Sequence, residues 1–123
     1  MRIKNKEVLV ELAGKRYHCA MDIAMSFVGG KWKTVVLWYL RKEKKRFGEL
    51  RDLCPQITER MLSITLKQLE KDGLVSRKVY TKKPPLKVEY SLTDFGKSLI
   101  PMLEEIAKWG RQVAKTKGKI IES

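Results

Sequence analysis

A leucine stripe with well-defined ends constrains the fold of this chain more than any other feature. Its members have the spacings of four and three residues that place side chains on one face of a helix: Leu62, Leu66 and Leu69. Thr58 is a good N-cap because its hydroxyl can accept a hydrogen bond from a free backbone amide. Gly73 suits the left-handed position that follows a helix end. The sequence therefore predicts a helix that starts after Thr58, ends before Gly73 and buries its leucines.

Two β-prone runs follow this helix and flank a turn rich in lysine and proline. The runs cover residues 74–81 and 87–92, and their composition predicts a hairpin. Pro84 and Pro85 restrict the backbone of the turn and cannot donate hydrogen bonds to another strand. The turn and its flank also carry three cations: Lys82, Lys83 and Lys87. Such a tip either keeps the hairpin soluble or contacts a polyanion.

The remaining apolar residues recur with helical periodicity in four further segments: residues 20–28, 31–41, 47–53 and 93–115. Pro101 lies inside the last of these helices and should kink it. Consecutive helices followed by a hairpin are typical of a winged helix-turn-helix, in which the second helix of the turn pair enters the major groove and the hairpin is the wing. We therefore expect a mainly α fold with a small β-hairpin.

Positive charge dominates the composition. Lysine and arginine number 27 against 14 aspartates and glutamates, which gives a net charge of +13. Such a field concentrates polyanions, nucleic acid before an anionic membrane surface, although a lysine-rich solubilising surface is the simpler interpretation. No segment approaches the ~20 apolar residues of a membrane span, and the first residues lack the apolar stretch of a signal peptide. We therefore expect a cytoplasmic protein with no membrane role.

The residue types that metal and enzyme chemistry require are scarce. The chain has one histidine, His18, and two cysteines, Cys19 and Cys54, which are too far apart for a Cys-x-x-Cys motif. It also lacks a phosphate-binding loop and a Gly-x-Ser-x-Gly motif. We expect no metal site, no cofactor and no enzymatic activity.

The face of the predicted helix opposite its leucines holds three cations, a hydroxyl and an isoleucine: Arg60, Ser63, Ile64, Lys67 and Lys71. An ordinary amphipathic helix with a solvated outer face is the plain interpretation. However, no acidic residue interrupts this arc, and an exposed isoleucine suits contact with a thymine methyl group. The hypothesis is that this face reads DNA.

Their positions suggest separate roles for these residues on DNA. Arg60 and Ser63 lie near the helix start, where side chains reach base edges, and arginine can bind guanine as a bidentate donor. Lys67 and Lys71 lie further along and suit phosphates, which position a protein without specifying sequence. Thr58 caps the helix and can also touch a phosphate. The lysines of the hairpin turn would contact the phosphate backbone of the DNA beside the groove.

Several motifs resemble the HxlR-type family of prokaryotic transcriptional regulators. They are VGGKW at 28–32, RFxEL at 46–50, LxxLExDGLVxR at 66–77 and VEYxLTxxG at 88–96. The resemblance implies a dimeric winged-helix regulator that binds an operator with dyad symmetry, and it implies dimerisation through the N-terminal and C-terminal helices. The C-terminal helix has a suitable apolar stripe, although it could instead pack on its own domain: Leu99, Leu103, Ile106, Trp109 and Val113.

With that resemblance, the expected organisation is one domain over residues 1–123. Residues 1–18 form an N-terminal arm, either a strand and turn or a loose segment. Residues 20–92 form the winged-helix core, and residues 93–117 form a C-terminal dimerisation helix.

The resemblance also suggests a redox or electrophile response. Some family members sense oxidants, quinones or aldehydes through one cysteine near the N-terminus, and Cys19 stands at the matching position. Lys15, Arg16 and His18 are nearby cationic or titratable groups that could favour a thiolate. Against this, Ala20 follows where many relatives have proline, and Cys19 could be a small buried apolar residue. Cys54 is expected to be a packing residue.

The leading hypothesis is a homodimeric, sequence-specific DNA-binding regulator whose partners are double-stranded DNA, a second copy of the chain and an oxidant or small-molecule effector. The alternative is a winged-helix module that binds nucleic acid without specificity, or a partner, with no sensing role. A specific reader should prefer its operator over random DNA by a factor of ~10³ or more.

Overall fold

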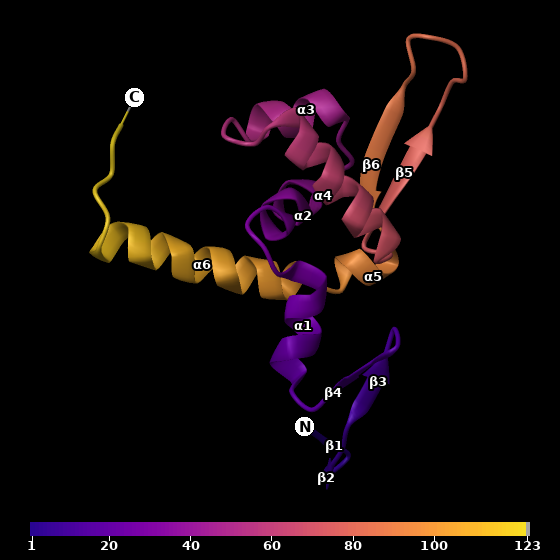
Figure 1. Cartoon of the computed structure of the whole chain (residues 1–123). Helices are drawn as coiled ribbons and strands as arrows, with labels where there is room; N and C mark the ends of the chain where they lie inside the picture. The colour runs from indigo at the N-terminus through magenta and orange to yellow at the C-terminus, as the bar shows by residue number, and fades with distance from the viewer. Residues whose placement is uncertain (123) are drawn as a thin grey trace.

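The computed structural model describes residues 1–122, which form six helices and three two-stranded antiparallel sheets (Figure 1). The helices are α1 (Ala20–Val28), α2 (Lys33–Leu40), α3 (Phe47–Leu53), α4 (Glu59–Lys71), α5 (Asp94–Lys97) and α6 (Ile100–Thr116). The strands are β1 (Arg2–Ile3), β2 (Lys6–Glu7), β3 (Val10–Leu12), β4 (Lys15–Tyr17), β5 (Val75–Val79) and β6 (Val88–Leu92). The order of α2, α3, α4 and the β5–β6 hairpin is that of a winged helix-turn-helix.

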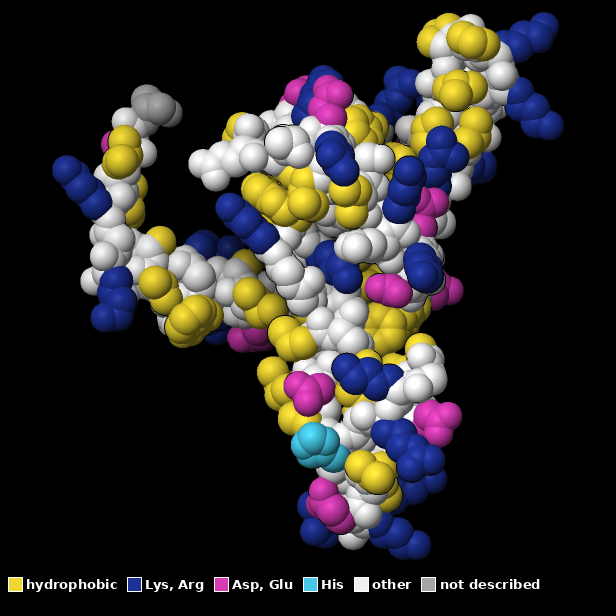
Figure 2. Space-filling model, viewed as in Figure 1, with side chains coloured by type: hydrophobic (Ala, Val, Ile, Leu, Met, Phe, Trp, Pro, Cys, Tyr) yellow, Lys and Arg dark blue, Asp and Glu magenta, His cyan; other side chains and the backbone are white. Residues whose placement is uncertain are grey.

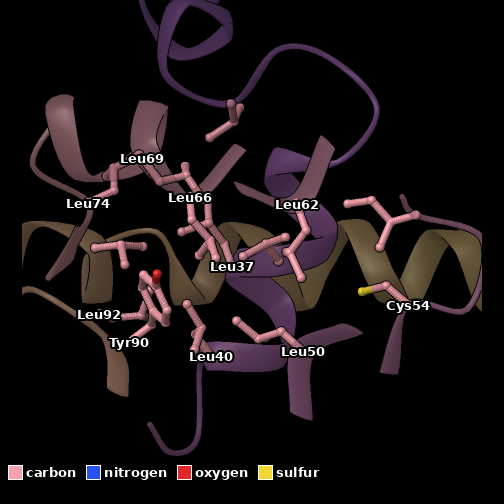
Figure 3. Packing of buried hydrophobic residues seen from close by; sticks show 14 of the residues in the cluster. Leu37, Leu40, Leu50, Cys54, Leu62, Leu66, Leu69, Leu74, Tyr90 and Leu92 are labelled. Carbon is pink, nitrogen blue, oxygen red and sulfur yellow. The ribbon is translucent and has the colours of Figure 1, made fainter. Parts of the chain in front are cut away.

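The hydrophobic core lies where α2, α3 and α4 meet the base of the β5–β6 hairpin. Leu37 of α2, Leu50 of α3 and Leu66 of α4 are buried and point toward one another (Figure 3). The other two stripe leucines are also buried, so the predicted inward face of α4 is confirmed. Burial of these side chains provides the main stabilisation of the domain.

The ends of α4 follow from local chemistry, as the sequence predicted. The Thr58 hydroxyl accepts a hydrogen bond from the Met61 amide at 3.0 Å. Gly73 has a φ of +78°, the left-handed conformation that glycine adopts without steric cost. Leu74 is then fully buried and leads directly into β5. Helix α4 and the wing are thus joined by a tight turn at residues 72–74.

The wing is anchored to the helical core by a third segment of extended chain. β5 and β6 pair in register from Val75 opposite Leu92 to Val79 opposite Val88. On the other side of β6, Lys45 and Tyr90 exchange two backbone hydrogen bonds of 2.9 and 2.8 Å. Residues 41–46, between α2 and α3, are therefore tied to the hairpin.

The prediction of one kinked C-terminal helix is wrong, because the segment forms two helices. Thr93 caps α5, and its hydroxyl accepts from the Gly96 amide at 3.0 Å. The chain turns at residues 98–99, and Pro101 stands in the first turn of α6. A proline has no N–H to donate, and the first turn is the part of a helix where that donor is not needed.

The N-terminal segment folds into two small hairpins, β1–β2 and β3–β4, so the strand-and-turn alternative is correct. The Met1 ammonium group closes the arm by donating to Glu7 Oε1 at 2.7 Å and to the His18 carbonyl at 2.7 Å. This arm lies at the opposite end of the molecule from the wing (Figure 1). Over residues 1–122, no helix is both long and apolar enough to cross a membrane.

Candidate nucleic-acid interface

The outer face of α4 is solvent-exposed, as a DNA-reading face requires. Arg60, Lys67 and Lys71 are exposed, as is Thr58, and Ser63 is half-buried. Within the described part of the chain, none of the three cations forms an ion pair with a carboxylate. Three unpaired positive charges on one exposed helical face can bind phosphates or guanine edges.

Ile64 lies at one side of this face rather than at its centre. It is 37% exposed and borders a surface depression that Trp32, Met61 and Gln68 also line. The depression lies beside the glycine-containing loop that precedes α2. The isoleucine therefore has partial packing contacts, which the sequence did not reveal, and still exposes enough apolar surface to meet a base methyl group.

Contacts between α3 and α4 orient the first turn of α4. Arg51 Nη1 donates to Glu59 Oε1 at 2.7 Å, and this hydrogen bond raises the pKa of Arg51. Ile57, in the turn between the two helices, is buried in the core. Cys54 is buried at the end of α3, and burial raises the pKa of its thiol. These contacts between α3 and α4 hold the first turn of α4 in place, and Arg60 lies in that turn.

The wing projects beyond the helices and carries its positive charge into solvent (Figures 1 and 2). Lys82, Lys83 and Lys87 are all exposed. Thr81 organises the turn, because its hydroxyl accepts from the Lys83 amide at 3.2 Å. Lys87 Nζ lies 4.0 Å from Glu89, so its charge is partly offset, whereas the two tip lysines have no such neighbour within residues 1–122.

The C-terminal helix divides its apolar residues between the core and solvent. Leu103 is buried in the chain's own core, and Leu99 is half-buried against it. Ile106 is 48% exposed and Trp109 is 68% exposed, while Val113 is half-buried. Beyond its first turns α6 extends away from the body of the domain (Figure 1). Its outer half therefore presents apolar surface that the described residues leave exposed.

Comparison with known families agrees with this arrangement of elements. The family model described as HxlR-like helix-turn-helix matches residues 27–118, about three quarters of the chain. The chain belongs to the HxlR family. Both the resemblance seen in the sequence motifs and the winged helix-turn-helix fold are confirmed.

Relatives of this HxlR-family chain are transcriptional regulators. The uncharacterized HTH-type transcriptional regulator YdeP of Bacillus subtilis is 40% identical over 111 residues, which cover 89% of this chain and 86% of that protein. The redox regulator HypR in its oxidized form is 45% identical with a TM-score of 0.72, covering 76% of this chain and 96% of that one. Reduced YodB from B. subtilis is 31% identical with a TM-score of 0.65, covering 83% and 98%. The chain is therefore a transcriptional regulator with a DNA-binding helix-turn-helix domain.

Cys19 of this HxlR-family chain is half-buried at the N-cap of α1 and carries a free thiol. The cations that the sequence placed near it have other partners. Lys15 Nζ lies 5.3 Å from the centre of the Tyr17 ring, and Arg16 approaches Glu11 at 3.8 Å.

Sequence reasoning missed two basic residues beside the wing. Lys44 is exposed on the connector between α2 and α3, and its Nζ donates to the Tyr80 hydroxyl at 3.4 Å. Lys78 of β5 also lies against the Tyr80 ring. Lys44 and Tyr80 are 36 positions apart, and no local pattern could have paired them. Among the described residues, no group of three His, Cys, Asp or Glu side chains is arranged to hold a metal ion.

Proposed function

We propose that this HxlR-family regulator acts as a homodimer on a dyad-symmetric operator, with α4 in the major groove and the β5–β6 wing on the adjacent backbone. The observation that carries the proposal is the exposed face of α4, where three cations have no carboxylate partner among residues 1–122 while the leucines behind them are buried. The net charge of +13 adds long-range attraction to a duplex.

Within this proposal the residues of α4 have different tasks. Arg60 and Ser63, near the helix start, contact base edges, and Ile64 meets a thymine methyl group from the side of the face. Lys67 and Lys71 contact phosphates, as do the tip lysines Lys82 and Lys83. Lys87 of the wing lies 4.0 Å from Glu89, which partly offsets its charge, and it contributes a further contact to the DNA backbone.

The proposed dimer uses the part of α6 that extends from the body. Ile106 and Trp109 expose large apolar surfaces there, with Val113 one further turn along. Leu103 and Leu99 support the helix from the core side. A two-fold dimer on B-DNA places its recognition helices ~34–36 Å apart, in successive major grooves.

Selection of bound sequences from a random duplex pool tests this function. The recovered sites should be inverted repeats, and affinity for them should exceed affinity for random DNA by ~10³ or more. Arg60→Ala should cost about 1–3 kcal/mol of operator binding and relax the preference at one base position. Lys67→Ala should weaken binding to all sequences equally and reduce the salt slope by about 0.9.

A matched control is Lys6→Ala, which removes the same charge from β2 in the N-terminal arm. If operator and random DNA bind equally well, and Arg60→Ala behaves like Lys6→Ala, the chain is a non-specific module and the proposal fails. Equilibrium sedimentation of the protein on a recovered site should also show two chains per duplex.

A second proposed property is an electrophile response through Cys19. Its partial exposure at the N-cap of α1 supports this, as does similarity to HypR, described as a redox regulator, and to YodB, whose structure has been solved with quinone bound. A quinone adds to a thiol by forming a carbon–sulfur bond, the thiol proton moves to one quinone oxygen, and the ring proton of the attacked carbon then moves to the other oxygen, which leaves a substituted hydroquinone. Quinone treatment should abolish operator binding by the wild type but not by Cys19→Ser. Equal loss in both proteins would exclude this role.

A further inference from the structure

Three lysines surround the Tyr80 side chain, two from the β5–β6 hairpin and one from the connector between α2 and α3. The ring is 42% exposed just beyond the end of β5. Its centre lies 4.8 Å from Lys78 Nζ, 5.0 Å from Lys87 Nζ and 5.7 Å from Lys44 Nζ. Lys78 and Lys87 lie close enough to the ring centre for its π-electrons to attract their ammonium groups, whereas Lys44 contacts the hydroxyl end of the ring. The ring therefore offsets part of the repulsion between three like charges.

Backbone pairing holds this cluster in place. The Tyr80 amide donates to the Lys87 carbonyl at 2.8 Å, which extends the β5–β6 ladder by one residue. Alternate residues of a strand share a face, so Lys78 and Tyr80 lie on the same side of the hairpin as Lys87. Lys44 comes from the α2–α3 connector, whose next residue, Lys45, is hydrogen-bonded to β6. The three lysines thus converge from positions fixed by the sheet.

The cluster keeps a net positive charge. Glu89 lies opposite Lys78 in the register, and its carboxylate is 3.6 Å from Lys44 and 4.0 Å from Lys87. One carboxylate against three ammonium groups leaves a net charge of about +2 on an exposed surface. Contact with the Tyr80 hydroxyl, and then attraction to Glu89, raises the pKa of Lys44.

We propose that the Tyr80 ring and the three ammonium groups around it form a binding site for one DNA backbone phosphate at the outer end of the β5–β6 ladder, just before the turn of the wing. The site combines Lys87 with Lys44 and Lys78 and leaves the tip lysines, Lys82 and Lys83, to contact other phosphates. This inference rests on the proposed DNA-binding function. Tyr80 is a positioning residue, since it directs the lysines and carries no charge of its own. A phosphodiester suits the site because it can accept from several ammonium groups at once.

The test is the salt dependence of DNA binding, measured for neutral changes at position 80. Tyr80→Leu removes the ring and should reduce the slope of log K against log salt by about 0.9, although no charge is lost. Tyr80→Phe retains the ring beside Lys78 and Lys87 and loses only the hydroxyl contact of Lys44, so its slope should stay closer to the wild-type value than that of Tyr80→Leu. Glu89→Gln should tighten binding, because it removes the carboxylate that offsets the cluster. The decrease in salt slope caused by Tyr80→Leu should be the same on operator and random duplexes.

Lys44→Ala provides a variant that does not depend on the hairpin fold, since this side chain is exposed on the connector. It should also lower the slope by about 0.9, whereas the control Lys6→Ala should not. The inference is overturned if Tyr80→Leu matches Tyr80→Phe, or if Lys44→Ala matches Lys6→Ala, while Arg60→Ala still loses operator affinity. If Arg60→Ala also has no effect on operator selectivity, the proposed function fails first.

Discussion

Gly96 lies where α5 packs on the start of the wing, and the backbone of Leu74 leaves no room there for a side chain. Gly96 is buried, and a Cβ atom added there would stand 2.1 Å from the Leu74 carbonyl oxygen and 3.1 Å from the Leu74 carbonyl carbon. Both are backbone atoms, so no side chain can rotate away. The same Leu74 carbonyl accepts from the Thr93 amide at 3.1 Å, and Thr93 caps α5. Gly96→Ala must therefore push α5 away from the wing.

The cost of Gly96→Ala can be worked from these contacts. An ordinary non-bonded contact needs about 3.5 Å, so the displacement exceeds about 1 Å, and overpacking of this kind costs about 1–3 kcal/mol. Weakening the hydrogen bond from Thr93 to Leu74 adds about 1 kcal/mol. The better helix propensity of alanine returns up to about 1 kcal/mol. The expected loss is about 2 kcal/mol, or roughly 8 °C in Tm for a domain of this size.

Urea and thermal unfolding, followed by circular dichroism at one fixed protein concentration, measure this loss. A constant concentration matters because the proposed dimerisation would make apparent stability concentration-dependent. Gly48→Ala is the matched control, since Gly48 lies in α3 and its added Cβ would meet only the Arg51 side chain at 3.8 Å. Gly48→Ala should be neutral or more stable by up to about 1 kcal/mol. Equal stability of the two variants would refute the reasoning.

Three other predictions follow from the capping residue of α4, the exposed face of α6 and the buried thiol. Thr58→Ala removes the N-cap and should destabilise the protein by about 1 kcal/mol, whereas Thr58→Asn should not; identical unfolding midpoints would show that the cap is unimportant. Ile106→Glu with Trp109→Glu should convert a dimer to a folded monomer in sedimentation velocity and weaken operator binding; an unchanged dimer would place the interface elsewhere. Burial raises the pKa of Cys54, so the Cys54 thiol keeps its proton to higher pH in the folded protein than in the unfolded chain. The stability that this difference contributes is fully present below the ordinary pKa of 9.0 and is lost as pH rises through the pKa of the folded state. The stability advantage over Cys54→Ala should therefore shrink above pH 9.0, and a constant difference would contradict it.

The sequence alone predicted helix α4 and the β5–β6 wing, because the residue patterns that determine them are local. The leucine spacing of α4, its Thr58 cap and the glycine after it act within one or two helical turns. The outward position of the cations follows from the same periodicity. The hairpin was equally readable, since strand composition and a proline-containing turn determine it over a few residues.

Only the tertiary structure decided which apolar residues of α6 serve the core and which remain exposed. Leu103 and Ile106 have the same chemistry and lie on one stripe, yet the first is buried and the second is half exposed, because α6 leaves the body between them. Likewise, Pro101 would kink a continuous helix, but here it stands in the first turn of a new one because the chain turns at residues 98–99. The meeting of Lys44 with Tyr80 required pairing of the connector with β6. Contacts between distant segments depend on how whole elements pack, and no local periodicity encodes that packing.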